Sequence, residues 1–326
     1  MKKYLILDKK IYAENYLAIT NKLGKKPAAA LKNNAYGLGL LDIAPVIEEV
    51  GCRNYFIYNL AEGIALRKVL KEDSNIISLG NIEAEGINEY FTYHITPTVG
   101  SLEEIKLYKH KLLALKGFCI YFDTGLHGKG ILWEEAEETH QLLKELPIKI
   151  IVSHLSSAWK TDLTKNQLQQ TRFKHIMEIF GKSITYSLTN TDGSRLGEDY
   201  TLQLPRIGRG LHGVSFYNNF FGTKPAFRIK GNITQLKRIK QNEEVGYGGY
   251  TKITEDINAA VVNLGTSHIN SINFPFCHQV IIENKTYEVL TLFLGYMIVN
   301  LKQDTYPYFT EVELVFKSRF DPNILI

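Results

Sequence analysis

The chain has 326 residues, of which 44% are hydrophobic and 22% charged, a balance that suits one large or two medium globular domains. The net charge is +4 and the acidic and basic residues are interleaved, so lysine-rich stretches such as 106–116 predict solvated helix faces, and we expect no nucleic-acid partner. No apolar stretch approaches ~18 residues, so we expect no membrane-spanning segment.

The three cysteines, Cys52, Cys119 and Cys277, are far apart and form no metal-binding motif. An unpaired set of this kind predicts buried thiols, a reducing compartment such as the cytoplasm, and no metal site. The basic and apolar start of the chain is broken by Asp8 and Lys9 and is too short for a signal-peptide core.

Short apolar runs alternate with longer segments of helical periodicity from residue 27 to about residue 210. The candidate strands are 27–32, 55–58, 75–79, 94–97, 117–122, 149–153, 184–188 and 203–207. The helix-like segments between them include 41–50, 60–70, 103–109, 133–143 and 167–180. Roughly eight strand–helix units predict an α/β fold, a parallel (β/α)8 barrel of the TIM type over residues 9–225, with its chemistry at the carboxyl ends of the strands.

The pattern becomes β-rich after about residue 225, which predicts a separate all-β domain over residues 226–326. Its candidate strands are 251–254, 259–264, 280–283, 287–294, 297–301 and 311–316. The opening strand, 4–7, precedes the barrel, and residues 1–8 are a candidate to pair into this second domain.

Residues 28–39 form the most informative segment, in which the apolar run Ala-Ala-Ala-Leu ends at Lys32 and a polar, glycine-bearing loop with Tyr36 follows. Burying an ammonium group is costly, so such a site favours a neutral amine or one consumed in a covalent bond with a carbonyl group. Pyridoxal phosphate is the commonest cofactor that holds a lysine in this way. The plain alternative is a lysine just beyond a strand that extends into solvent.

Six further short motifs share one order along the chain: Asp-Thr-Gly-Leu-His at 123–127, Val-Ser-His-Leu at 152–155, Asn-Gln at 166–167, Asn-Thr at 190–191, Arg-Ile-Gly at 206–208 and Val-Gly-Tyr-Gly at 245–248. Together with the segment around Lys32, this series resembles the alanine racemase family over nearly the whole chain. A dehydrogenase is disfavoured because no Gly-x-Gly-x-x-Gly follows a strand.

The resemblance implies a pyridoxal phosphate enzyme with Lys32 bonded to the cofactor. It places Arg206 opposite the pyridine nitrogen with His154 behind it. An arginine there donates a hydrogen bond without yielding a proton, so the ring remains a weak electron sink. The other cofactor-binding residues that it implies are Tyr36, Asn190, Thr191, Ile207 and Gly208.

Racemisation requires a base on each face of the α-carbon, because one removes a proton while the other delivers one. Lys32 is one candidate, and the resemblance implies Tyr247 as the other. In the family this tyrosine reaches the cofactor of the partner subunit, which implies a head-to-tail homodimer acting on a small amino acid.

The chain departs from the family at positions that face the substrate. Gly128 stands where the family has the arginine that binds the substrate carboxylate, and Lys129 lies beside it. Tyr121 replaces the carbamylated lysine that supports this arginine, and Thr266 replaces a tyrosine at the substrate entrance. A loose alignment puts Leu294 near the carboxylate, so Lys129 and Leu294 are the tentative carboxylate residues.

The family's terminal Arg-x-Pro-Arg-x-Tyr segment, whose tyrosine adds a phosphate contact, has no counterpart before Ile326. Three interpretations therefore stay open: an alanine racemase with a remodelled entrance, a racemase of another or bulkier amino acid, and a non-catalytic protein that binds pyridoxal phosphate.

Overall fold

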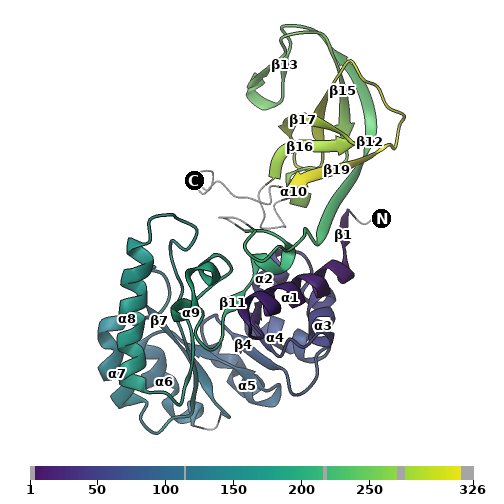
Figure 1. Cartoon of the computed structure of the whole chain (residues 1–326). Coiled ribbons are helices and arrows are strands. Elements are labelled where there is room, and N and C mark those ends of the chain that lie inside the picture. Colours follow the sequence, from purple (N-terminus) through teal and green to yellow (C-terminus); the bar gives the residue numbers. More distant parts are fainter. Residues whose placement is uncertain (1–3, 114, 216–218, 270–275, 317–326) are drawn as a thin grey trace. The chain divides into compact units, whose positions relative to one another are not determined.

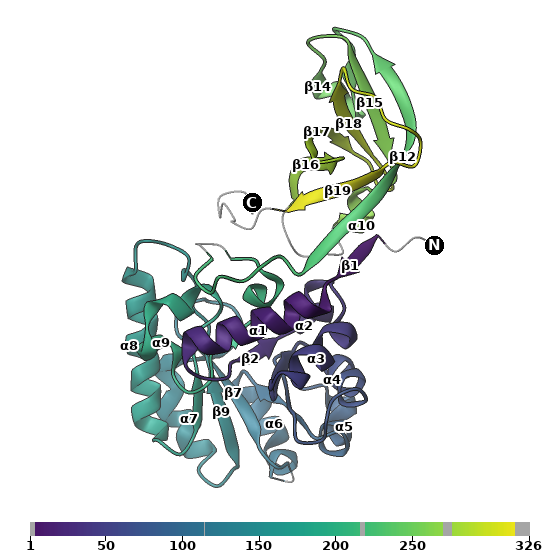
Figure 2. The ribbon, with the colours of Figure 1, turned by 45° about the vertical axis from the view of Figure 1, so that its right-hand side comes forward.

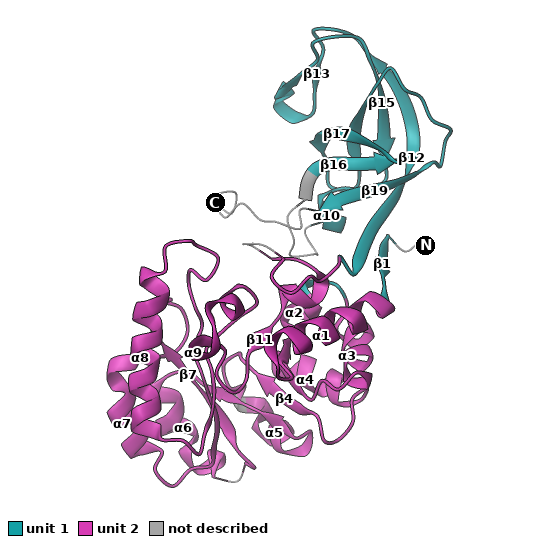
Figure 3. Cartoon of the chain, in the orientation of Figure 1, with its two compact units in different colours: residues 1–8, 36–38, 225–320 teal, residues 9–35, 39–224, 321–326 magenta. Residues whose placement is uncertain are grey.

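The computed structural model describes residues 4–113, 115–215, 219–269 and 276–316. The chain divides into two compact units, one of residues 9–35, 39–224 and 321–326 and the other of residues 1–8, 36–38 and 225–320 (Figure 3).

The first unit is an α/β structure whose strands are all parallel. Its strands are β2 (Ala28–Ala30), β3 (Asn54–Ile57), β4 (Asn75–Ser78), β5 (Ile95–Thr96), β6 (Thr98–Val99), β7 (Phe118–Asp123), β8 (Ile131–Leu132), β9 (Ile148–Val152), β10 (Thr185–Ser187) and β11 (Arg206–Ile207). They pair in the orders β11-β2-β3-β4-β5 and β10-β9-β7-β6, with β8 beside β7. The predicted parallel α/β architecture is confirmed.

The two parallel sheets approach each other at both ends. Pro97 separates β5 from β6, and its carbonyl still accepts a hydrogen bond from the Cys119 backbone N–H at 2.8 Å. At the other end, Leu204 and Arg206 donate backbone hydrogen bonds of 3.3 Å to the carbonyls of Tyr186 and Thr189. Strand β11 is therefore linked both to β2 and to the segment that contains β10.

The longer helices lie on the outside of these strands (Figures 1 and 2). The helical segments of this unit are α1 (Lys9–Leu23), α2 (Lys32–Tyr36), α3 (Leu40–Glu49), α4 (Leu60–Arg67), η1 (Ala84–Gly86), α5 (Ile87–Thr92), α6 (Leu102–Leu112), η2 (Trp133–Glu135), α7 (Ala136–Leu142), α8 (Thr164–Phe180), η3 (Asp192–Leu196), α9 (Glu198–Thr201) and η4 (Arg209–His212). Asn59 and Ser101 begin α4 and α6 as N-caps, because their side chains accept the backbone N–H of Glu62 and Glu104.

The interior of the first unit is built mainly from small and branched side chains of the strands. One buried cluster consists of Ala28, Phe56, Ile77, Cys119, Ile150, Val152 and Leu204. The half-buried residues Ala30, Leu79 and Tyr121 pack against it. Ala30 ends β2 two residues before Lys32, so this packing fixes the strand end that presents the lysine.

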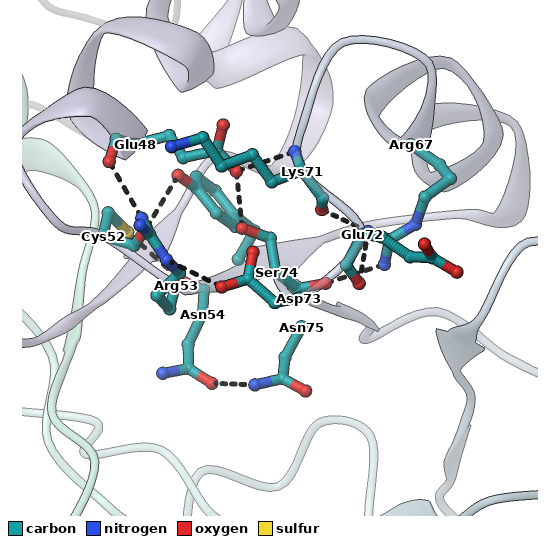
Figure 4. Close-up of polar contacts among 11 residues, drawn as sticks. Glu48, Cys52, Arg53, Asn54, Arg67, Lys71, Glu72, Asp73, Ser74 and Asn75 are labelled. Carbon is teal, nitrogen blue, oxygen red and sulfur yellow. Dashed lines mark hydrogen bonds and ion pairs between the residues drawn. The ribbon is translucent and has the colours of Figure 1, made fainter.

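A polar cluster lies where β3 and β4 begin, at the opposite ends of these strands (Figure 4). The buried Glu48 carboxylate accepts hydrogen bonds from Ser74 Oγ at 2.6 Å and from the Lys71 backbone N–H at 3.0 Å. Arg67 donates to the carbonyls of Tyr93 at 3.0 Å and Ser74 at 2.7 Å. These bonds provide partners for the backbone groups of the turn before β4, so the cluster has a structural role.

The second unit is built from antiparallel strands. They are β1 (Leu5–Leu7), β12 (Phe227–Ile239), β13 (Glu244–Val245), β14 (Thr251–Lys252), β15 (Ile257–Val262), β16 (Phe276–Ile282), β17 (Lys285–Leu292), β18 (Met297–Lys302) and β19 (Glu311–Phe316), with the short helices η5 (Tyr247–Gly249) and α10 (Thr266–Ile269). The main sheet runs β1-β12-β15-β18-β17-β16-β19, and β12 also pairs with β19, which closes the sheet on itself.

The opening strand β1 pairs with the first residues of β12 in an antiparallel arrangement. Strand β12, of 13 residues, was not predicted, and the strand expected at 251–254 is only the two-residue β14. Cys52 and Cys119 are buried free thiols as predicted, whereas the side chain of Cys277 lies outside the described residues.

Across the described parts of the chain, the helices include none that is long and apolar enough to cross a membrane. The same residues contain no group of three or more His, Cys, Asp and Glu side chains that could hold a metal ion.

Candidate active site

Lys32 lies two residues beyond β2, at the carboxyl end of the strand, and is half-buried. The neighbouring Leu31 donates its backbone N–H to the Phe56 carbonyl at 2.8 Å, which ties the strand end to β3. Burial lowers the pKa of the Lys32 amine, and the charges of Arg206 and Arg209 lower it further. The lysine is therefore biased toward the neutral amine, the form that attacks a carbonyl carbon.

Arg206 is fixed on β11 with only 4% of its surface exposed. Its Nη1 donates to the carbonyl and to Oγ of Ser187, both at 2.7 Å, and its Nη2 donates to the Ser153 carbonyl. The guanidinium also lies over the Phe56 ring, 5.6 Å from the ring centroid. These contacts hold a permanent positive charge in one orientation, as a group that must hydrogen-bond a fixed ligand atom requires.

His154 contacts Arg206 on one side and Asn190 on the other. Its Nδ1 lies 3.4 Å from Arg206 Nη2, and its Nε2 lies 3.4 Å from Asn190 Nδ2. Burial lowers the pKa of His154 to about 3, and the charges of Arg206, Lys32 and Arg209 act in the same direction. The imidazole is therefore neutral at physiological pH and adds no charge beside Arg206, and its one unprotonated nitrogen can accept a hydrogen bond.

Thr191 organises the loop that follows β11. Its Oγ1 accepts the backbone N–H of Gly208 at 3.3 Å and of Gly210 at 3.2 Å. A Cβ atom on Gly210 would lie 3.0 Å from Thr191 Cγ2 and 3.1 Å from Ile207 Cγ2, so the loop is packed tightly against both side chains. Thr191 Oγ1 is the acceptor in both bonds, so its hydroxyl proton can be donated to an anion such as a phosphate.

Lys129 is half-buried, and its Nζ donates to the Leu79 carbonyl at 3.1 Å, just beyond β4. Its stem crosses Gly100, where a Cβ atom would lie 2.5 Å from Lys129 Cε. Burial lowers the pKa of Lys129, and the charge of Glu104 opposes this shift. The neighbouring Gly128 is exposed and carries no side chain, so it is Lys129 that places a positive charge near the ends of β4 and β6.

Tyr247 and Leu294 both belong to the β-rich unit, where Tyr247 contacts Phe293, the residue before Leu294. Tyr247 is 82% exposed, between Gly246 and Gly248, whose φ angles of 90° and 72° favour glycine. Its ring meets that of Phe293 at a centroid distance of 5.2 Å, and the next residue, Leu294, is 74% exposed.

The first unit therefore brings together most of the predicted cofactor residues: Lys32, His154, Asn190, Thr191, Arg206, Ile207 and Gly208. Tyr36 is half-buried and ends α2. The sequence reasoning missed Arg209, whose charge lowers the pKa values of Lys32 and His154. Its signal was a second arginine only three residues after Arg206, within the same loop.

The family model described as "Alanine racemase, N-terminal domain" matches residues 7–216. The chain belongs to the alanine racemase family. It is 30% identical to the alanine racemase of Rickettsia africae over 271 residues, which cover 80% of this chain and 74% of the relative. It is 29% identical to that of Rickettsia bellii over 306 residues, covering 86% and 71% respectively.

Solved structures of alanine racemases share the fold. The enzyme from Bartonella henselae, determined with covalently bound pyridoxal phosphate, superposes with a TM-score of 0.82 at 22% identity and covers 96% of this chain and 90% of its own. That from Streptomyces lavendulae gives a TM-score of 0.83 at 18% identity, with 96% and 87% covered. The resemblance drawn from the motifs is thus confirmed at the level of family and fold.

Proposed function

We propose that this chain is a pyridoxal phosphate-dependent racemase that interconverts L- and D-alanine. The observation that carries the proposal is the placement of Lys32 at a strand end, with its pKa lowered by burial and by Arg206 and Arg209. Membership of the alanine racemase family and the covalently bound cofactor in the Bartonella henselae relative support the same activity.

The donor set fits this cofactor. A half-buried amine of lowered pKa suits covalent attachment at Lys32, and the Arg206 guanidinium is rigidly held beside it. The Thr191 hydroxyl and the tightly packed loop at Gly208 and Gly210 suit a phosphate. Pyridoxal phosphate, when bound, supplies an aldehyde for amino groups and a ring that withdraws electrons from the substrate α-carbon.

The proposed roles of the residues follow from their chemistry. Arg206 hydrogen-bonds the ring nitrogen and keeps its own proton, while His154 and Asn190 hold it from behind. Thr191 and Tyr36 offer hydroxyl groups to the phosphate, and Ile207 and Gly208 supply backbone that the phosphate can approach closely.

Racemisation is completed by two bases, for which we propose Lys32 Nζ on one face of the substrate and Tyr247 Oη on the other. The exposed position of Tyr247 between two glycines suits a side chain that serves a partner subunit. We therefore propose a head-to-tail homodimer in which each β-rich unit supplies Tyr247 to the other subunit.

The strand pairings support a closed (β/α)8 barrel, with β5 and β6 acting as one strand interrupted at Pro97 and β10 joined to β11 by backbone hydrogen bonds. We propose the domain limits 9–225 for the barrel and 226–326 for the β domain, together with residues 1–8. The buried free thiols Cys52 and Cys119 favour the cytoplasm as the site of action.

Lys129 is the cation that we propose for the substrate carboxylate, and Leu294 of the β-rich unit is the second residue that we propose for this role. Thr266 is smaller than the tyrosine that the family has at the substrate entrance, and we therefore propose a racemase of a bulkier amino acid as the second candidate.

The test is to incubate the purified protein and pyridoxal phosphate with single L-amino acids and to measure the D-isomer by chiral chromatography. We expect the D-isomer to form fastest from alanine. Faster turnover of a branched or charged amino acid would support the second candidate. No D-isomer from any of them, with the cofactor bound, would make this a non-catalytic cofactor-binding protein.

A further inference from the structure

The segment immediately after Lys32 adopts a left-handed turn. Asn33, Asn34, Ala35 and Tyr36 have φ angles of 54°, 52°, 53° and 60°. Left-handed helical conformation costs L-residues roughly 1–2 kcal/mol each, and only asparagine tolerates it with some ease. A run of four such residues that includes alanine and tyrosine therefore needs support from its surroundings.

Glu62 on α4 gives this support, because both oxygens of its carboxylate accept backbone hydrogen bonds. Oε1 accepts the N–H of Asn34 at 2.6 Å, and Oε2 accepts the N–H of Tyr58, just beyond β3, at 2.8 Å. Glu62 is itself fixed in the first turn of α4, where its own backbone N–H donates to Asn59 Oδ1 at 2.9 Å. The negative charge is favourable at the beginning of a helix.

Hydrogen bonds from residues next to the turn also stabilise it. The Ala35 N–H donates to the Leu31 carbonyl at 2.8 Å, and Asn34 Oδ1 accepts the N–H of Leu40 at 2.8 Å. Lys32 thus lies between Leu31, which is tied to β3, and Asn34, which is tied to α4 through Glu62. Both attachments lie within two residues of the lysine.

We propose that Glu62 is a positioning residue for Lys32: by bridging the left-handed turn and the end of β3, it holds the lysine backbone where the amine meets the cofactor aldehyde. This inference rests on the proposed function. Glu62 acts through the turn and is not a catalytic residue.

A carboxylate is required for this bridge, because two N–H donors need two acceptors. Glutamine offers one oxygen and one NH₂ group. In Glu62→Gln the NH₂ group therefore faces the backbone N–H of either Asn34 or Tyr58, so that two donors meet. Glu62→Asp keeps both oxygens on a shorter stem. Glu83 offers a matched control, because its Oε1 accepts the Leu60 N–H at 2.9 Å in the same turn of α4 without contacting the turn after Lys32.

The experiment uses the full chain with pyridoxal phosphate. Wild type, Glu62→Gln, Glu62→Asp and Glu83→Gln are reduced with borohydride at timed intervals, and the labelled fraction of the Lys32 peptide is measured by mass spectrometry. Hydrogen exchange of peptides that cover residues 31–40 and the thermal unfolding temperature are measured on the same samples.

We expect Glu62→Gln to label Lys32 about tenfold more slowly, the factor that corresponds to one lost charge-assisted hydrogen bond, and to exchange faster over residues 31–40. Glu83→Gln should match wild type in both, and Glu62→Asp should restore part of the labelling rate. Where turnover is measurable, kcat should fall while KM changes little, because Glu62 does not touch the substrate.

Wild-type labelling of Lys32 in Glu62→Gln would overturn the proposal while leaving the proposed function intact. Equal slowing in Glu62→Gln and Glu83→Gln would also overturn it, because it would reduce the role of Glu62 to stabilising α4. If wild type itself takes up no label at Lys32, the proposed function fails, and the positioning role fails with it.

Discussion

Replacing Lys129 tests how this chain binds the substrate carboxylate. An ammonium group has three N–H donors, and Lys129 uses one of them for the Leu79 carbonyl at 3.1 Å, which leaves two for a carboxylate. Lys129→Met keeps an unbranched stem across Gly100 but removes the charge and the donors.

The size of the effect follows from the partial burial of Lys129. A hydrogen bond to a charged group contributes about 1.5–3 kcal/mol, and solvent screening places this half-buried lysine at the lower end. A loss of about 1.5 kcal/mol corresponds to an increase in KM of about tenfold for L-alanine. The maximal rate should change much less, because Lys129 takes no part in proton transfer.

The assay follows formation of D-alanine by chiral chromatography over a range of L-alanine concentrations. The control is Lys165→Met, which removes an equally charged but exposed side chain on α8 and should leave KM unchanged. Lys129→Arg should recover part of the affinity, because the charge returns. A KM for Lys129→Met equal to that of wild type would refute the carboxylate role and leave it to backbone N–H donors.

Three further predictions concern the cofactor lysine, the second base and acid stability. Arg209→Met should raise the pKa of Lys32, so that chemical labelling of Lys32 by an amine-reactive reagent requires a higher pH than in wild type; an unshifted pH profile would contradict the proximity of the two charges. Lys32→Ala and Tyr247→Phe should each be inactive as homodimers. If the tyrosine comes from the partner subunit, a mixed dimer of the two variants should recover activity in up to roughly half of its sites. Verified heterodimers without activity would exclude that arrangement. Burial lowers the pKa of His212 to about 3, so between about pH 6.5 and 3 this histidine is protonated in the unfolded chain but not in the folded protein. Its own share of the stability should fall by about 1.4 kcal/mol per pH unit as the pH is lowered through this range, and His212→Asn should reduce the slope by that share in urea unfolding measured from pH 7 to pH 4.

The parallel α/β pattern could be predicted because buried strands leave continuous apolar runs. Strand β12 could not, because its second half carries polar residues such as Gln235, Lys237 and Arg238, and Gly231 interrupts its first half. Only the alternate residues near its start are buried, so its sequence lacks the period of a half-buried strand over its full length.

Some of the site residues could likewise be predicted from the sequence, and others could not. Lys32, Arg206 and Thr191 stand in recognisable local motifs, whereas the groups that hold them come from distant parts of the chain. Arg206 bonds Ser153, which lies 53 residues away, and Glu62 reaches Asn34 across 28 residues. Contacts of this kind depend on which strand ends the fold brings together, and no single motif encodes them.

The most direct test of the central claim is to locate the cofactor on the protein. The full-length chain incubated with pyridoxal phosphate is reduced with borohydride, digested and examined by peptide mass spectrometry. The account predicts that one phosphopyridoxyl group is attached to the peptide that contains Lys32, and that Lys32→Ala remains unlabelled and colourless after dialysis. Stable labelling of another lysine in place of Lys32, or a Lys32→Ala variant that keeps the full cofactor absorbance, would contradict it.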